Sequence, residues 1–173
     1  SNGVLYSVAS ASNTTVVGRD SSGNELWSSA FSVGLNPGVV LGSNEDEVGI
    51  LWQDGTNMPH LSLVNGLGVV TEITCPFVDA VTSGEIHAFC YSEEMELWVL
   101  IQGNQMASGP TLTDLTLSPN TLPKRVLGIS EDGGKFVIVG YDQMCISTTD
   151  GQSFTTVAVS DTSGSTQLNA VIG

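Results

Sequence analysis

The stretch that decides the fold is Arg125-VLGISEDGGKFVIVGYDQMCISTTDGQSFTTVAV-Ser160. Short apolar runs alternate in it with three polar turn sequences, Asp132-Gly133-Gly134, Asp142-Gln143 and Asp150-Gly151. Asp-Gly is the strongest short-range hairpin signal, because a tight two-residue turn needs positive φ at its central positions. The stretch therefore predicts four strands joined by successive hairpins, an up-and-down antiparallel meander.

The same alternation of apolar runs and turn residues continues through the whole chain. It predicts only short strands and no helix, which excludes an α/β enzyme fold. The composition supports this prediction, since the 173 residues include 20 Gly and only 13% are charged. Many glycines and few charged residues favour short strands joined by tight turns over helices. The predicted strands are Val4–Ala9, Thr15–Gly18, Val39–Leu41, Val48–Trp52, His60–Val64, Gly68–Ile73, Ile86–Tyr91, Leu97–Ile101, Thr111–Leu117, Val126–Ile129, Lys135–Gly140, Met144–Ser147, Ser153–Val159 and Leu168–Ile172.

A pattern of an apolar second strand followed by a polar turn recurs along the chain. It ends at Asp20, Asp54, Ser92 and Asp142, positions 34, 38 and 50 residues apart. This spacing is close to the roughly 40–50-residue period of propeller blades. The segment 38–73 gives a second well-defined copy, in which Asn65-Gly66 supplies another primed-turn dipeptide.

We therefore expect an all-β fold, a β-propeller or partial propeller of about four four-stranded antiparallel blades. A β-sandwich of similar strand count is the alternative, because it shows the same alternation without a true repeat. The expected organisation is a single repeat domain over 1–173, cut from a longer chain because the run Leu168–Gly173 ends in what reads as mid-strand. The approximate repeats are 4–37, 38–77, 78–122 and 123–173.

The charge of the chain narrows the range of partners. Eighteen acidic residues against four basic ones give a formal net charge of −14. A surface of that sign repels phosphate backbones and anionic headgroups, so neither nucleic acid nor a membrane surface is expected as a partner. No run of about 18 apolar residues is present, so membrane insertion is not expected either.

The segment Ile146-Ser-Thr-Thr-Asp-Gly-Gln-Ser-Phe154 resembles the Asp-box, also called the bacterial neuraminidase repeat. The matching residues are Thr148, Thr149, Asp150, Gly151 and Phe154, with Thr for Ser and Phe for Trp, and Ser21–Trp27 is a looser second match. The resemblance implies a structural turn, in which the Asp and hydroxyl groups bond the turn backbone and the aromatic ring packs beneath it. The variant form resembles repeats of phage virion proteins such as tail, fibre or spike components.

No residue set supports a catalytic, metal-binding or cofactor-binding prediction. The sialidases that the Asp-box suggests use an arginine triad, whereas this chain has only Arg19 and Arg125. The two His and three Cys follow no ligand spacing, and the Trp residues are expected to pack in cores. The acidic residues cluster at predicted hairpin tips: Glu45-Asp46-Glu47, Glu93-Glu94 with Glu96, and Glu131-Asp132. We expect these to be solvated turns. A pair of glycosidase carboxylates and a weak calcium site are the less favoured alternatives.

Two classes of function remain. The first is a non-enzymatic structural or binding module of a virion or an extracellular assembly, which presents loops to a protein partner or to a cell-surface glycan, as a single chain or as a homo-oligomer. The second is an accessory domain of a larger carbohydrate-active enzyme whose catalytic residues lie elsewhere. The sequence names neither the ligand nor the residues that would bind it.

Overall fold

The computed structural model describes residues 5–10, 14–31, 40–44, 47–54, 56–65, 67–78 and 87–157. All regular elements in this part of the chain are β-strands, arranged in four open antiparallel sheets. The expected all-β fold is confirmed. The chain divides into two compact units, Ser1–Gly84 and Glu85–Gly173, and each is described by itself.

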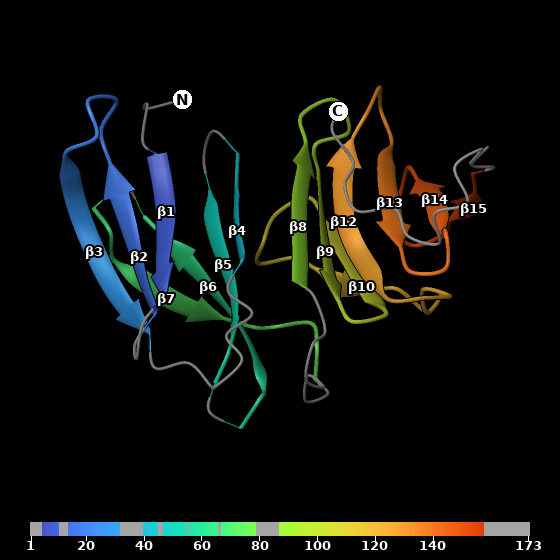
Figure 1. The fold of residues 1–173 in the computed structure, drawn as a ribbon, viewed down its shortest axis with the longest axis horizontal. Helices are drawn as coiled ribbons and strands as arrows, with labels where there is room; N and C mark the ends of the chain where they lie inside the picture. The colour runs from blue at the N-terminus through green and yellow to red at the C-terminus, as the bar shows by residue number, and fades with distance from the viewer. Residues whose placement is uncertain are drawn as a thin grey trace. The chain divides into compact units, whose positions relative to one another are not determined.

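The first unit contains a three-stranded and a four-stranded sheet, each a meander in sequence order (Figure 1). The first sheet consists of β1 (Leu5–Ser10), β2 (Thr14–Arg19) and β3 (Glu25–Phe31). The second consists of β4 (Val40–Ser43), β5 (Val48–Gln53), β6 (Pro59–Val64) and β7 (Val70–Ile73). A fourth strand for the first sheet would fall within 32–39, which lies outside the described residues.

The core of the first unit lies between these two sheets. Val16 of β2 is fully buried and clusters with Val48, Ile50 and Val64 of the second sheet. Trp27 of β3 packs against the same cluster. Val48, Ile50 and Trp52 occupy alternate positions of β5, so one face of that strand supplies the contact with the first sheet.

The second unit contains two four-stranded meanders (Figure 1). The third sheet consists of β8 (His87–Ser92), β9 (Leu97–Gln102), β10 (Gln105–Gly109) and β11 (Thr116–Leu117). The fourth consists of β12 (Val126–Glu131), β13 (Phe136–Gly140), β14 (Cys145–Thr148) and β15 (Thr155–Thr156). The first strands of the two sheets, β8 and β12, lie beside each other.

One core cluster of the second unit is shared by both sheets. Val99, Ile101 and Met106 of the third sheet meet Phe136, Ile138 and Ile146 of the fourth, all fully or almost fully buried. Successive four-stranded meanders that bury their faces against one another are arranged as the blades of a propeller are. Within each unit the propeller-like expectation therefore agrees with the structure.

The turns of the fourth sheet follow the sequence prediction. Gly133 and Gly134 have φ of 55° and 74°, and Asp142 and Gln143 have φ of 53° and 59°. Two consecutive positive φ values define the type I′ turn that matches the twist of a two-residue hairpin. The four strands β12 to β15 follow one another as predicted. The third turn, at Asp150-Gly151, is the exception: Ser147 pairs with Thr155, so this turn is longer than two residues, and Gly151 has positive φ whereas Asp150 does not.

The third repeat differs from its predicted alignment. Phe89–Ser92 was expected to end a second strand, but it lies in β8, the first strand of its sheet. The true second strand is β9, which ends at Gln102. The prediction was wrong because both strands are apolar and both end in a polar turn, so the pattern alone does not distinguish them.

Two strands were absent from the predicted set. In β3, neighbouring Leu26 and Trp27 are 54% exposed and half-buried respectively, so only one of two adjacent apolar side chains faces the core. In β10, Ala107, Ser108 and Gly109 are all buried. Small residues carry little strand propensity. They are needed in β10 because the turn at Asp150-Gly151 packs closely against Ser108. The strand predicted over Thr111–Leu117 shrinks to β11, since its first residues form a turn.

The Asn65-Gly66 dipeptide does not form the two-residue turn expected from it. The backbone of Asn65 pairs with Val69, which leaves three residues between them, and the positive φ of 77° belongs to Gly68. The side chain of Asn65 selects this longer turn, as described below. The predicted strand Leu168–Ile172 lies outside the described residues.

Candidate functional site

Three hairpins in the first unit close with the same five-residue turn. Asp20, Asp54 and Asn65 each occupy its first position, after β2, β5 and β6. In each case, one side-chain oxygen accepts the N–H of the third and fifth residues at 2.8–3.0 Å. The fourth residue always has positive φ, and it is Gly23, Asn57 or Gly68. These short polar side chains therefore act as acceptors for otherwise unpaired turn amides.

The hydrogen bonds hold the two carboxyl groups in their ionised form. The Asn24 side chain and turn amides lower the pKa of Asp20. The Thr56 hydroxyl, followed by the backbone of Met58 and Thr56, lowers the pKa of Asp54 to about 2. A carboxyl that is ionised and already hydrogen-bonded makes a poor general acid. The geometry at these turns indicates a structural role.

The turn after β14 uses a different arrangement with the same purpose. Asp150 Oδ1 accepts the N–H groups of Gln152 and Ser153, both at 2.8 Å, and Thr148 Oγ1 accepts the N–H of Gly151 at 2.9 Å. Burial opposes ionisation of Asp150, but the bonds from Ser153, Gln152 and Thr148 outweigh it and lower the pKa to about 2. Phe154 packs against the core of the unit. The side chains of Thr148 and Asp150 therefore bond the turn backbone.

The Asp150 turn also joins the fourth sheet to the third. Gln152 Nε2 donates to Ser108 Oγ at 2.7 Å, and Ser108 Oγ donates to the Asp150 carbonyl at 3.0 Å. Ser118 and Asn120 donate to the Gln152 carbonyl at 2.8 and 2.9 Å. A Cβ on Gly151 would lie 2.3 Å from that of Ser108, so the backbones meet without room for a side chain. The turn therefore links the two sheets through hydrogen bonds and close backbone packing.

The looser match at Ser21–Trp27 is a different turn. It lies between the second and third strands of its sheet, whereas the Asp150 turn lies between the third and fourth. Its acceptor is Asp20, which precedes the matched residues. The sequence similarity between Ser21–Trp27 and the Asp150 turn is therefore not matched by their positions in the sheet or by their hydrogen bonds.

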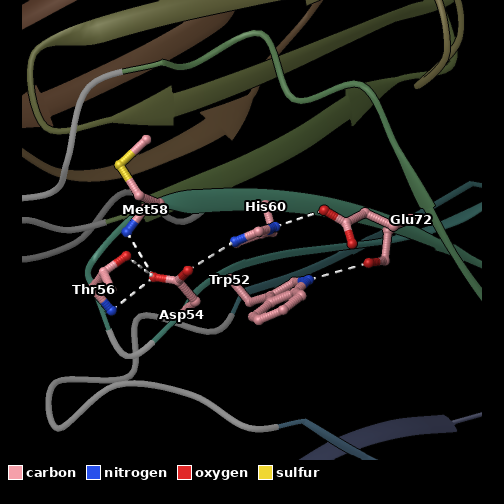
Figure 2. A network of polar contacts seen from close by, with 7 residues as sticks. Trp52, Asp54, Thr56, Met58, His60 and Glu72 are labelled. Carbon is pink, nitrogen blue, oxygen red and sulfur yellow. Dashed lines mark hydrogen bonds and ion pairs between the residues drawn. The ribbon is translucent and has the colours of Figure 1, made fainter.

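A polar network surrounds His60 on β6 (Figure 2). The His60 ring stacks on Trp52 with a centroid distance of 4.4 Å. Its Nδ1 lies 2.6 Å from Glu72 Oε1, and its Nε2 lies 3.4 Å from Asp54 Oδ2. Burial lowers the pKa of His60, but the two carboxylates outweigh it, so the pKa lies above its usual value near 6.5.

This network could not be predicted from the sequence, because Asp54, His60 and Glu72 follow no spacing that indicates a site. Strand pairing places them together: Trp52 lies opposite His60, and Ser62 opposite Glu72. The neighbouring hydroxyl, Ser62 Oγ, already accepts the Trp52 N–H at 3.1 Å and is not bonded to the imidazole. A histidine held by two carboxylates without a nucleophile on its other nitrogen is no catalytic triad.

A second group of chemically active side chains lies at the hairpin tip between β13 and β14. Lys124 Nζ pairs with Asp142 Oδ2 at 2.8 Å, and the Arg125 guanidinium lies over the Tyr141 ring, 5.6 Å from its centroid. All four side chains are exposed. This tip brings together two of the four basic residues of the chain and an exposed aromatic ring.

The other residues considered as candidates from the sequence lie at ordinary turn or core positions, or outside the described residues. Glu93, Glu94 and Glu96 lie exposed at the β8–β9 turn, and Glu131 accepts the N–H of Gly134 at 3.1 Å. Glu45 and Asp46 lie outside the described residues, as does the side chain of His87. Among the described residues, no group of His, Cys, Asp and Glu is arranged to hold a metal ion. Trp98 is fully buried, as expected for core packing, and Cys75, Cys90 and Cys145 are free thiols.

Comparison with known proteins adds no name to this geometry, since neither a protein-family model nor a curated protein matches the sequence. Within the described part of the chain, no helix is long and apolar enough to cross a membrane.

Proposed function

We propose that the chain is a non-enzymatic structural and binding module whose sheets present hairpin tips to a partner. One observation carries the proposal: among the described residues, the carboxyl groups whose pKa is lowered furthest serve the fold. Asp54 and Asp150, the two carboxyls with a pKa of about 2, both hold the amides of their own turns.

The proposed setting is a virion or extracellular assembly, as a tail, fibre or spike component that contacts a host-surface glycan or another protein. The support for this setting is the resemblance of Thr148, Asp150, Gly151 and Phe154 to the phage-type repeat. In this turn Thr148 and Asp150 accept backbone N–H groups, and Phe154 packs against the core. The net charge of −14 agrees with a soluble surface that does not bind polyanions.

The test is to incubate the purified chain with a panel of bacterial envelope polysaccharides on beads. We expect the chain to be retained by a subset of the polymers, which stay intact. The same supernatants are assayed for new reducing ends. Release of reducing sugar would contradict a non-enzymatic role, and loss of retention on every polymer would remove the glycan-binding part of the proposal.

A further inference from the structure

We infer that the β13–β14 hairpin tip, with its flank at Lys124 and Arg125, is a binding site for a carboxylated saccharide such as a hexuronate. The inference deepens the proposed function and rests on it, because it names the tip and the chemical class of the glycan. The residues that form this uronate tip are Lys124, Arg125, Tyr141, Asp142 and Gln143.

The first observation is the aromatic ring. Among the large hydrophobic side chains that are exposed in the described residues, Tyr141 is the one aromatic, at 39% exposure, and the others are aliphatic. Arg125 lies over the ring at 5.6 Å from its centroid, and this stacking holds the guanidinium in place. A flat ring beside fixed polar groups is the combination that orients a sugar, because the ring contacts the C–H face while polar groups meet the hydroxyls.

The second observation is charge. In a chain of net charge −14 with four basic residues, two adjacent ones are exposed at this tip. Lys124 already holds a carboxylate, that of Asp142, at 2.8 Å. A ligand carboxylate can take the place of Asp142 on Lys124 and release Asp142 to accept a sugar hydroxyl. A single carboxylate suits this small basic area, whereas a polyphosphate meets the repulsion of the whole surface.

The third observation is backbone conformation. Asp142 and Gln143 are consecutive non-glycine residues with φ of 53° and 59°, whereas the other type I′ turn of the same sheet uses Gly133 and Gly134. A type I′ turn favours Asn-Gly or Asp-Gly, and side chains that persist at positive φ are found at functional sites more often than elsewhere. Asp142 therefore suits the turn, whereas Gln143 keeps a polar side chain where the fold alone favours Gly.

The test measures binding of methyl galacturonoside, which carries a single carboxylate, by calorimetry, with its methyl ester as the neutral form of the same sugar. We expect millimolar-range affinity for one tip, typical of a small exposed site, and at least about fivefold weaker binding of the ester. Lys124→Ser is expected to weaken binding of the acid at least about fivefold. Lys135→Ser, which removes one exposed charge from the neighbouring hairpin, is expected to change it less than about twofold.

A second pair of variants separates binding from folding. Tyr141→Ala is expected to abolish detectable binding. The double variant Asp142→Asn with Gln143→Gly is expected to melt at a higher temperature than the wild type while it binds the acid more weakly. A variant that folds better and binds worse cannot owe its loss of binding to misfolding.

The outcomes separate the site from the proposed function. Equal binding of the acid and its ester, or unchanged binding in Tyr141→Ala and Lys124→Ser, would overturn the uronate tip. If Tyr141→Ala is still retained on envelope polysaccharides as the wild type is, the tip is wrong and the binding module stands. If the wild type binds neither methyl galacturonoside nor any polysaccharide, both the tip and the glycan-binding function are wrong.

Discussion

His60 is the residue whose protonation couples most directly to the fold of the first unit. Its imidazole lies between Glu72 on β7 and Asp54 at the β5–β6 turn, so the charged form links three segments of one sheet. Its pKa is raised in the folded state, and the protonated form is therefore favoured by folding. The stability from this network is full below about pH 6.5 and decreases as the pH rises through the folded pKa.

We expect the free energy of unfolding to fall by at most about 1 kcal/mol as the pH rises from about 6 to 9, because His60 is partly exposed. Urea unfolding at a series of pH values measures it. His60→Gln is expected to flatten this slope, whereas His87→Gln controls for the only other histidine. A wild-type slope that His60→Gln leaves unchanged would remove His60 as its source.

Asp150 makes the stability of the second unit depend on pH in the acidic range, as His60 does for the first unit near neutral pH. Its pKa of about 2 lies below the usual 3.8, so its contribution is present above about pH 4 and is lost as the pH falls through 2. Asp150→Ala is expected to lower the free energy of unfolding at pH 7 by about 1 kcal/mol, an estimate reduced for solvent exposure. The difference between wild type and variant is expected to shrink at pH 2, as chemical denaturation at both pH values can show.

At the scale of elements, the hairpin turns determine strand register. The five-residue turns at Asp20 and Asn65 share their hydrogen bonds and carry glycine at the fourth position, with φ of 84° at Gly23 and 77° at Gly68. Their surroundings differ. A Cβ on Gly23 would meet nothing within 4 Å, whereas a Cβ on Gly68 would lie 2.3 Å from Cγ of Trp27.

This pair separates backbone strain from steric exclusion. Gly23→Ala is expected to cost about 1 kcal/mol through its φ alone. Gly68→Ala is expected to cost about 1–3 kcal/mol more, because it also displaces Trp27 from the core of the first unit. Thermal unfolding with a tryptophan fluorescence readout compares the two variants. Equal losses in both would show that the Trp27 contact carries no weight.

The same elements show how far sequence reasoning reaches. Gly133-Gly134 and the alternation around them predict β12 to β15, because turn chemistry and apolar period agree there. β10 escapes prediction because its small residues are selected by a turn far away in sequence, which packs on Ser108. The His60 network escapes for a related reason, since strand register rather than spacing brings Asp54 and Glu72 to it.

At the scale of the whole molecule, charge is the dominant property. The chain has eighteen acidic residues and only four basic ones, so few attractive ion pairs exist for salt to weaken. Repulsion among the carboxylates dominates its electrostatics instead. Salt screens that repulsion, with a Debye length that falls from about 30 Å at 0.01 M to about 10 Å at 0.1 M.

We therefore expect the melting temperature to rise when NaCl is increased from 10 to 300 mM, by several degrees for a net charge of this size. Differential scanning calorimetry at pH 7 measures it. The same titration near the isoelectric point, about pH 4.1, serves as the control and is expected to show little rise. A fall in melting temperature at pH 7 would indicate that attractive ion pairs outweigh the repulsion.

The central claim is that the polar side chains at the turns serve as backbone acceptors, the observation on which the proposed non-enzymatic role rests. Amide hydrogen exchange by NMR tests it most directly at Asn24, Met58, Val69 and Ser153, whose N–H groups donate to Asp20, Asp54, Asn65 and Asp150. We predict exchange at least about tenfold slower than in an unstructured peptide, and loss of that protection at Ser153 alone in Asp150→Ala. Exchange at peptide rates in the wild type at all four amides would contradict the account.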